Sequence, residues 1–104
     1  MKLKIKDGKH PFGQPDPYII EDNGNFFIFT TGEDGVHCYQ ARKITGEYEY
    51  LGIVFKRKGY KEYWAPAVIK YKENYFLYVS YMHEHSDDVH EQTLVVASSS
   101  RITF

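Results

Sequence analysis

The sequence predicts an all-β fold of antiparallel four-stranded meander sheets, about two blades of a β-propeller. Three observations lead to this prediction. Short runs of β-forming residues alternate with turns along the chain, and no stretch of ten residues has helical spacing. A β unit near the start of the chain repeats after about fifty residues, close to the period of propeller blades. Two blades are a partial propeller, because a closed ring needs at least about four.

The N-terminal residues 2–6 alternate lysines with Leu3 and Ile5. This period of two is typical of a strand with one solvated face, and lysines protect the open edge of a sheet. We therefore expect an edge strand at 2–6, followed by a loop that leads to Asp16.

The first repeat begins at Asp16-Pro17-Tyr18-Ile19-Ile20. Proline restricts its own φ and the residue before it, so Asp16 is expected to point in a defined direction. The turn Asp22-Asn23-Gly24 supplies the left-handed positions of a hairpin, and the aromatic run 25–31 favours a strand. Further strands are expected at 36–43 and 48–55, after turns at 32–35 and 45–47. Blade one is predicted at about 16–55.

The second repeat begins at Trp64-Ala65-Pro66-Ala67-Val68-Ile69, after a polar connection at 56–63. Its strands are expected at 65–71, 74–82 and 93–99, with a turn at Lys72-Glu73-Asn74 and a charged loop at 83–92. No fourth strand follows, so blade two is predicted at about 65–104 and incomplete. The chain 1–104 is predicted to be a single partial propeller domain.

Composition narrows the function classes. The chain of 104 residues is 42% hydrophobic and 17% aromatic, which predicts a folded core. Its net charge of -1 argues against nucleic acid as a partner, and no segment has the length and apolarity of a membrane span. The lone Cys38 cannot form an internal disulfide. That favours the cytoplasm weakly and also fits a trimmed secreted protein.

Three parts of the chain resemble the start of a family-43 glycoside hydrolase, or a neighbour in the same five-bladed propeller group of arabinanases, β-xylosidases and arabinofuranosidases. The matching segments are Asp16-Pro17-Tyr18-Ile19 with the hairpin Asn23-Gly24-Asn25-Phe26-Phe27, Trp64-Ala65-Pro66 with Tyr75-Phe76-Leu77-Tyr78, and Val96-Ala97-Ser98-Ser99-Ser100 before Ile102-Thr103. The resemblance covers nearly the whole chain but only an N-terminal, two-blade part of such an enzyme.

In that family the aspartate of a first-blade Asp-Pro motif is the general base that activates water, and the resemblance implies this role for Asp16. The other two acids of the family would lie beyond residue 104. Inversion at a glycosidic bond needs a base and an acid about 6.5 to 9.5 Å apart, so the resemblance implies an inactive piece. Ala67 stands where relatives often carry an acid. The ending Ile102-Thr103-Phe104, where relatives continue Ile-Thr-Gly-Pro-Phe, predicts a truncation.

Each candidate site residue has a plainer alternative. Asp16 could cap a turn by accepting hydrogen bonds from nearby backbone amides. Trp64 is a candidate platform for stacking a sugar, or it packs between blades. Phe29 is a second candidate for substrate binding, although the aromatic runs as a whole are expected to form the core.

The remaining candidates are weaker. The run His83-Glu84-His85-Ser86-Asp87-Asp88-Val89-His90-Glu91 has donors that suit a divalent metal, but no second cluster matches it, so a solvated loop is favoured and no metal or cofactor is assigned. Cys38 is expected to be a buried small hydrophobe, because no pattern of an activated thiol surrounds it. His37 beside it is expected to be incidental, and Lys56–Lys61 an exposed connecting loop.

Two functions remain open. The first is a family-43-type glycosidase acting on arabinose- or xylose-containing polysaccharide, present here as a piece that carries only the general-base position, Asp16. The second is a non-catalytic carbohydrate-binding or structural β module. A two-blade piece would expose apolar sheet edges and a blade face. We therefore expect a homo-oligomer, in which a neighbouring chain pairs with residues 2–6 or completes the missing fourth strand.

Overall fold

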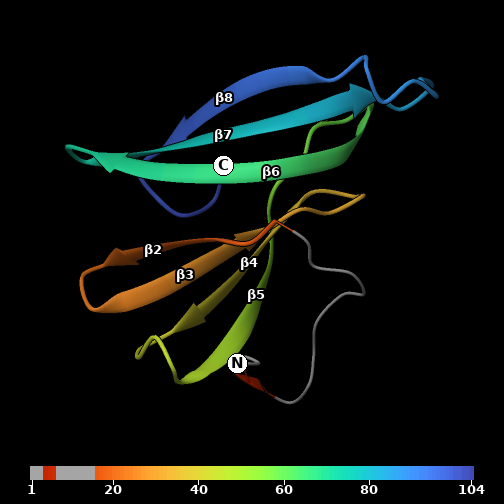
Figure 1. The fold of residues 1–104 in the computed structure, drawn as a ribbon. Helices are drawn as coiled ribbons and strands as arrows, with labels where there is room; N and C mark the ends of the chain where they lie inside the picture. Colours follow the sequence, from red (N-terminus) through yellow and green to blue (C-terminus); the bar gives the residue numbers. More distant parts are fainter. Residues whose placement is uncertain (1–3, 7–15) are drawn as a thin grey trace.

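The computed structural model describes residues 4–6 and 16–104, and these residues form two packed β-sheets (Figure 1). The strands are β1 (Lys4–Ile5), β2 (Tyr18–Asp22), β3 (Asn25–Thr30), β4 (Val36–Ala41), β5 (Glu47–Phe55), β6 (Tyr60–Tyr71), β7 (Asn74–His83) and β8 (Thr93–Ser99). The first sheet has the order β1-β5-β4-β3-β2 and the second β6-β7-β8. The predicted all-β fold is confirmed. No helix in the described part of the chain is long and apolar enough to cross a membrane.

Both hairpins that open the repeats form as predicted. β2 pairs with β3 up to Asp22 and Asn25, around a two-residue turn in which Asn23 has φ 51° and Gly24 φ 80°. β6 pairs with β7 up to Tyr71 and Asn74 in the same way. Left-handed residues in such turns match the right-handed twist of the flanking strands, which is why Asn and Gly suit the first turn.

The register of these hairpins shows which residues of the two repeats are equivalent. Tyr18 pairs with Phe29 in the first sheet, and Ala67 pairs with Tyr78 in the second, each one residue after a proline. The residue before the proline is therefore Asp16 in the first repeat and Ala65 in the second. Their φ angles are 55° and 51°. The family resemblance indicates Ala67 as the position of a second acid, but the residue equivalent to Asp16 by register is Ala65.

Strand β6 begins earlier than predicted, at Tyr60, so the expected polar connection at 56–63 is partly strand. Its pairing with β7 shifts register between Lys61 and Trp64 and again between Trp64 and Ala67. Such bulges let a strand continue past residues whose backbone leaves the extended region. Here those residues are Glu62, with φ 56°, and Ala65.

The N-terminal edge strand is confirmed for residues 4 and 5, while residues 2 and 3 lie outside the described part of the chain. Lys4 and Ile5 pair in parallel with Glu47 and Tyr48 at the outer edge of the first sheet. β5 occupies only one edge of this strand, so the expectation that a neighbouring chain pairs with it stays a prediction.

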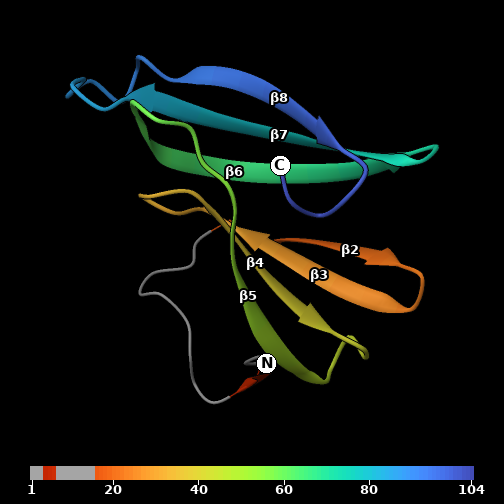
Figure 2. The same ribbon diagram turned by 180° about the vertical axis from the view of Figure 1, so that it is seen from behind.

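The larger core cluster lies between the two sheets. Its fully buried members include Phe29 and Val36 from the first sheet and Val68 and Leu77 from the second. The C-terminal segment turns back toward the space between the sheets (Figure 2), where Phe104 packs against this core and donates its backbone N–H to Val54 at 2.6 Å. The aromatic runs are thus mainly core, as predicted.

The second sheet exposes the face that the first sheet buries. Phe29 and Tyr78 are equivalent by register, yet Phe29 is 0% exposed and Tyr78 is 37% exposed. Around Tyr78 lie Ile69, Leu94 and Val96, which are 47%, 71% and 52% exposed. We call these four residues the outer face. Contiguous apolar residues on a strand face are typical of an interaction surface.

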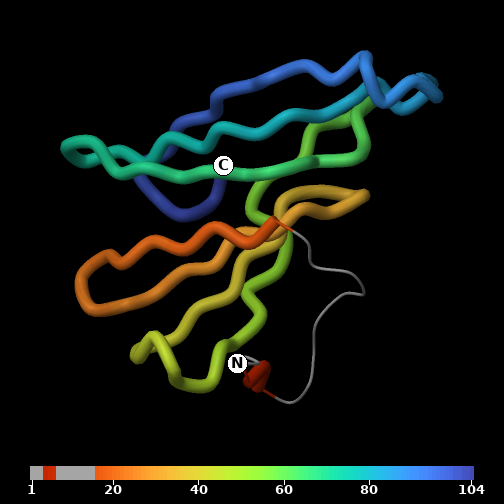
Figure 3. The backbone as a smooth tube through the Cα atoms, viewed as in Figure 1, coloured from red at the N-terminus to blue at the C-terminus, as the bar shows by residue number. Residues whose placement is uncertain are grey.

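Backbone hydrogen bonds join the sheets where the turn after β3 meets the start of β6 (Figure 3). Gly32 and Tyr63 exchange two bonds of 3.0 and 2.8 Å, and Glu62 donates its N–H to the carbonyl of Glu33 at 2.9 Å. A side chain at Gly32 would collide with its surroundings, because a Cβ there would lie 2.3 Å from the Gly35 carbonyl oxygen and 2.4 Å from the His37 ring.

We expect Gly32→Ala to lower the free energy of unfolding by about 3 kcal/mol or more, the upper part of the range for overpacking, since backbone must shift to admit the methyl group. The control is Gly24→Ala, where φ is 80° but no atom lies within 4 Å of the new Cβ. It should lose only the roughly 1 to 2 kcal/mol of a left-handed alanine. Urea unfolding measures both. Equal losses would contradict the close approach at Gly32.

A side-chain network joins the sheets at the opposite end of β2. The Asp22 carboxylate accepts hydrogen bonds from the Tyr75 hydroxyl and from Lys70 Nζ, the latter at 2.9 Å. These contacts, the Tyr75 bond foremost, hold the pKa of Asp22 below its usual value of 3.8. They favour the charged carboxylate, so the network ties the first hairpin to the second sheet at neutral pH.

We expect Asp22→Asn to destabilise the chain at pH 7 and to matter progressively less in acid. The pKa is lower in the folded state, so the stabilisation is present above pH 3.8 and is lost as the pH falls through the lowered pKa. Urea unfolding at pH 7 and at about pH 2 to 3 tests this. Asp87→Asn, in an exposed loop, is the control. A difference independent of pH would show that the carboxylate charge is not involved.

Candidate functional site

Asp16 lies two residues before β2, with its side chain exposed. Its Oδ2 accepts a hydrogen bond of 3.3 Å from the Thr31 hydroxyl. The φ of Asp16 is 55°, which is unusual for two reasons. Left-handed backbone is uncommon in residues other than glycine, and a following proline normally favours an extended conformation. The sequence predicted a defined direction for Asp16. The observed conformation departs from the one that the following proline favours, and it occurs together with the tertiary hydrogen bond from Thr31.

Thr31 comes directly after β3 and is only 6% exposed. Its hydroxyl oxygen accepts the backbone N–H of Ala65 at 2.9 Å. Three segments from both repeats therefore meet at one hydroxyl group. The sequence reasoning missed Thr31, because a threonine at the end of an aromatic strand carries no signal of its own. Only the pairing of the two sheets brings it to Asp16.

Trp64 directly precedes Ala65 and is half-buried. Its Nε1 donates a hydrogen bond of 3.3 Å to the Glu62 carboxylate. Both residues line a shallow pocket of about 300 Å³, which is completed by Lys61, Met82, Ser86, Asp87 and Val89. An indole with a partly open surface beside polar groups is suited to contact a sugar. Sequence reasoning does not find Glu62, because the polar composition of 56–63 predicts a connection and not a strand.

Phe29 has no surface on which a sugar could stack. It is 0% exposed and belongs to the core between the sheets. The alternation of strand β3 points Phe29 toward the second sheet, as it does Phe27. The proposed ligand contact is therefore corrected to a core position.

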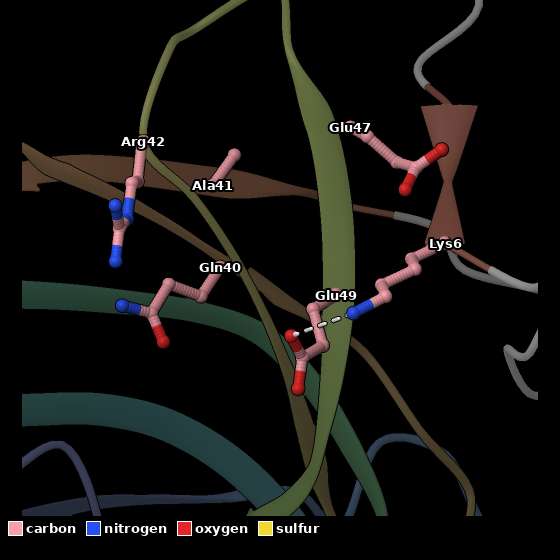
Figure 4. Close-up of a pocket in the computed structure, with 6 residues that line it drawn as sticks. All are labelled: Lys6, Gln40, Ala41, Arg42, Glu47 and Glu49. Carbon is pink, nitrogen blue, oxygen red and sulfur yellow. Dashed lines mark ion pairs between the residues drawn. The ribbon is translucent and has the colours of Figure 1, made fainter.

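A second pocket of about 380 Å³ lies on the first sheet, away from these residues (Figure 4). It is lined by Lys6, Gln40, Ala41, Arg42, Glu47 and Glu49. Lys6 and Glu49 form an ion pair of 3.9 Å in which both side chains are more than half exposed. Exposed pairs of this kind contribute little, and the mixed charges define no ligand class.

His37 is not incidental, as it was expected to be, but holds the turn at 32–35. The buried ring bonds Asp34 Oδ1 at 2.8 Å through Nε2 and the Tyr50 hydroxyl at 2.7 Å through Nδ1. Burial, and then the nearby Asp34 charge, raises the pKa of the Tyr50 hydroxyl. The two bonds of His37 tie the turn at 32–35 to strand β5, which gives this cluster a structural role.

Cys38 is fully buried in the core, as expected. Burial raises the pKa of its thiol to about 12, well above the range in which a thiolate forms. Because only the thiolate is an effective nucleophile, Cys38 is not a catalytic group.

Several side chains of the charged loop at 83–92 form hydrogen bonds and ion pairs with one another. His90 Nδ1 lies 3.0 Å from Asp88, His85 lies 3.3 Å from Glu84, and Ser86 donates to Glu91 at 3.0 Å. Among residues 4–6 and 16–104, no three His, Cys, Asp or Glu side chains are grouped in a way that could hold a metal ion.

Comparison with known proteins places the fold. No protein-family model matches the sequence, and no curated protein does. Solved structures do match. The arabinanase Arb43A of Bacillus subtilis is 22% identical, with a TM-score of 0.66 over 84% of this chain and 33% of that one. A family-43 enzyme of Xanthomonas citri is 16% identical, with a TM-score of 0.71 over 86% and 30%.

A third match is a β-xylosidase/α-arabinofuranosidase from a compost metagenome, solved with xylotriose. It is 17% identical, with a TM-score of 0.71 over 86% of this chain and 32% of that one. The chain has the fold of part of a family-43 glycoside hydrolase. It spans about a third of the length of these family-43 enzymes, so the match covers part of their β-propeller.

Proposed function

We propose that this chain supplies two blades and the general base of a family-43-type glycoside hydrolase that acts on arabinose- or xylose-containing polysaccharide. The observation that carries the proposal is the combination of the family-43 fold with an exposed carboxylate, Asp16, held at the head of the first repeat. Several enzymes with this fold are named as arabinanases or xylosidases.

In the proposed reaction Asp16 takes a proton from a water molecule, and that water attacks the anomeric carbon from the face opposite the departing sugar. The bond to the departing oxygen breaks as a carboxylic acid protonates it, on the far side of the ring. The position equivalent to Asp16 in the second repeat is Ala65, which has no carboxylate. We propose that the general acid comes from outside these two blades.

The alternative is a non-catalytic carbohydrate-binding module. One observation favours it: the pocket beside Trp64 offers an aromatic surface and polar groups, and Asp16 is not among its lining residues. In this alternative the sugar occupies the pocket beside Trp64, and Asp16 only orders its turn.

A titration with xylotriose distinguishes the two proposals. We expect saturable binding at millimolar concentration, seen in the fluorescence of Trp64, the only tryptophan. If Asp16 is the base, xylotriose also shifts its carboxyl carbon resonance, while the exposed Glu47 on the first sheet serves as the unshifted control. A change at Trp64 without one at Asp16 favours the module. No binding by about 10 mM contradicts both proposals.

Hydrolysis of nitrophenyl α-L-arabinofuranoside and β-xyloside tests the proposal that the general acid comes from outside these two blades. We expect no turnover by the chain alone, because one carboxylate cannot serve both sides of the bond. Turnover that disappears in Asp16→Ala would show that the acid is on this chain, and would contradict that part of the proposal.

We also propose that the chain self-associates through the outer face formed by Ile69, Tyr78, Leu94 and Val96. This face is equivalent by register to the one that the first sheet buries against the second. Removing its apolar area from water favours a partner sheet.

Sedimentation velocity at about 50 μM tests self-association. We expect a species larger than a monomer, and a monomer for Leu94→Glu, which places a charge at the most exposed residue of the outer face. The control is Leu51→Glu, which changes an exposed leucine of the first sheet and should leave association intact. A monomer for the unaltered chain would contradict the proposal.

A further inference from the structure

The geometry points to Thr31 as a positioning residue that sets the direction of the Asp16 carboxylate. The inference rests on the proposed function of Asp16 as the base, and it adds a residue and a mechanism to that site. The link runs through three groups: the Ala65 N–H donates to the Thr31 hydroxyl oxygen at 2.9 Å, and the Thr31 hydroxyl donates to Asp16 Oδ2 at 3.3 Å.

The Ala65 bond determines which way the Thr31 hydroxyl points. An amide N–H can only donate, so the hydroxyl oxygen must be the acceptor. The single hydroxyl hydrogen then remains for another partner, and the Asp16 carboxylate, which only accepts when ionised, is that partner. The direction of donation along the chain of three groups follows from their chemistry.

Thr31 is also a rigid support. Its β-branched side chain has few χ1 rotamers, and it is only 6% exposed, so its oxygen has little freedom to move. Asp16, by contrast, is exposed and sits in a left-handed conformation that its following proline disfavours. A non-glycine residue remains in such a conformation when its surroundings hold it there, and Thr31 contributes a hydrogen bond to Asp16.

The second repeat provides an internal comparison. Ser80 is equivalent to Thr31 by register, and Ala65 is equivalent to Asp16. With no carboxylate to accept its proton, the Ser80 hydroxyl lies 3.5 Å from the carbonyl of Trp64 in its own sheet. Thr31, in the repeat that carries the acid, bonds to the other repeat, whereas its equivalent Ser80 bonds within its own sheet.

The arrangement makes the base dependent on both repeats. Asp16 is attached to Thr31 within the first repeat, and Thr31 is attached to the backbone of the Trp64-Ala65-Pro66 segment in the second. A carboxylate that must meet a water molecule and an anomeric carbon needs to be held in its productive direction, and a small misplacement lowers the rate strongly.

Nuclear magnetic resonance of the sugar-free chain tests the inference with Thr31→Val, which keeps the shape and removes the hydroxyl. We expect the Ala65 amide to exchange with solvent about tenfold faster, the loss expected for one hydrogen bond. We also expect the three-bond couplings of Asp16 to change from values typical of one dominant χ1 rotamer to values averaged over several rotamers. Thr31→Ser should restore both, and Ser80→Ala should change neither.

Unchanged Asp16 couplings in a folded Thr31→Val chain would overturn the inference, even if the Ala65 amide changed, because a purely structural threonine would act on the amide alone. If Thr31→Val does not fold, the exchange of the Thr31 hydroxyl proton with solvent tests the inference instead. It should be protected from exchange in the unaltered chain and lose that protection in Asp16→Ala. Equal protection in both chains would overturn the inference.

These measurements need no sugar, so they are separate from the test of the proposed function. Asp16 couplings that depend on Thr31, together with no response of Asp16 to xylotriose, would confirm the positioning contact and contradict the role of Asp16 as a base. A response to xylotriose without dependence on Thr31 would support the base and overturn the positioning inference.

Discussion

Hydrogen bonds between the turn after β3 and the first half of β6 hold the two sheets together at one end. There the backbones of Gly32 and Tyr63 pair directly, so the two sheets are connected by hydrogen bonds as well as by apolar packing. Apolar packing alone is non-directional and tolerates sliding. Backbone bonds at one end, and the Asp22 network at the other, fix how the sheets are placed on one another.

The candidate site lies at this junction because the junction creates it. Bulges and left-handed residues at Glu62 and Ala65 bring a backbone N–H of the second repeat to the Thr31 hydroxyl. The same departure from regular pairing places Trp64 beside its pocket. Irregular backbone at a functional site is common, since strain is tolerated where surrounding contacts hold it.

The two repeats are alike in backbone and different in chemistry. Asp16 and Ala65 share a left-handed φ before proline, but only the first carries an acid. Phe29 and Tyr78 share a register position, but only the first is covered by a second sheet. The face of the first sheet that carries Phe29 is covered by the second sheet, and the equivalent face of the second sheet is open. This agrees with a match to about a third of a family-43 propeller.

Most of the strands, both hairpins, the repeat and the resemblance to the family-43 fold could be predicted from the sequence, because period-two patterns, turn residues and a fixed spacing are local properties of the chain. Four features became clear only in the folded chain: Phe29 is core, β6 begins at Tyr60, His37 is bonded on both nitrogens, and Thr31 contacts Asp16. These features arise between segments far apart in sequence, and no local pattern contains the register shifts that bring those segments together.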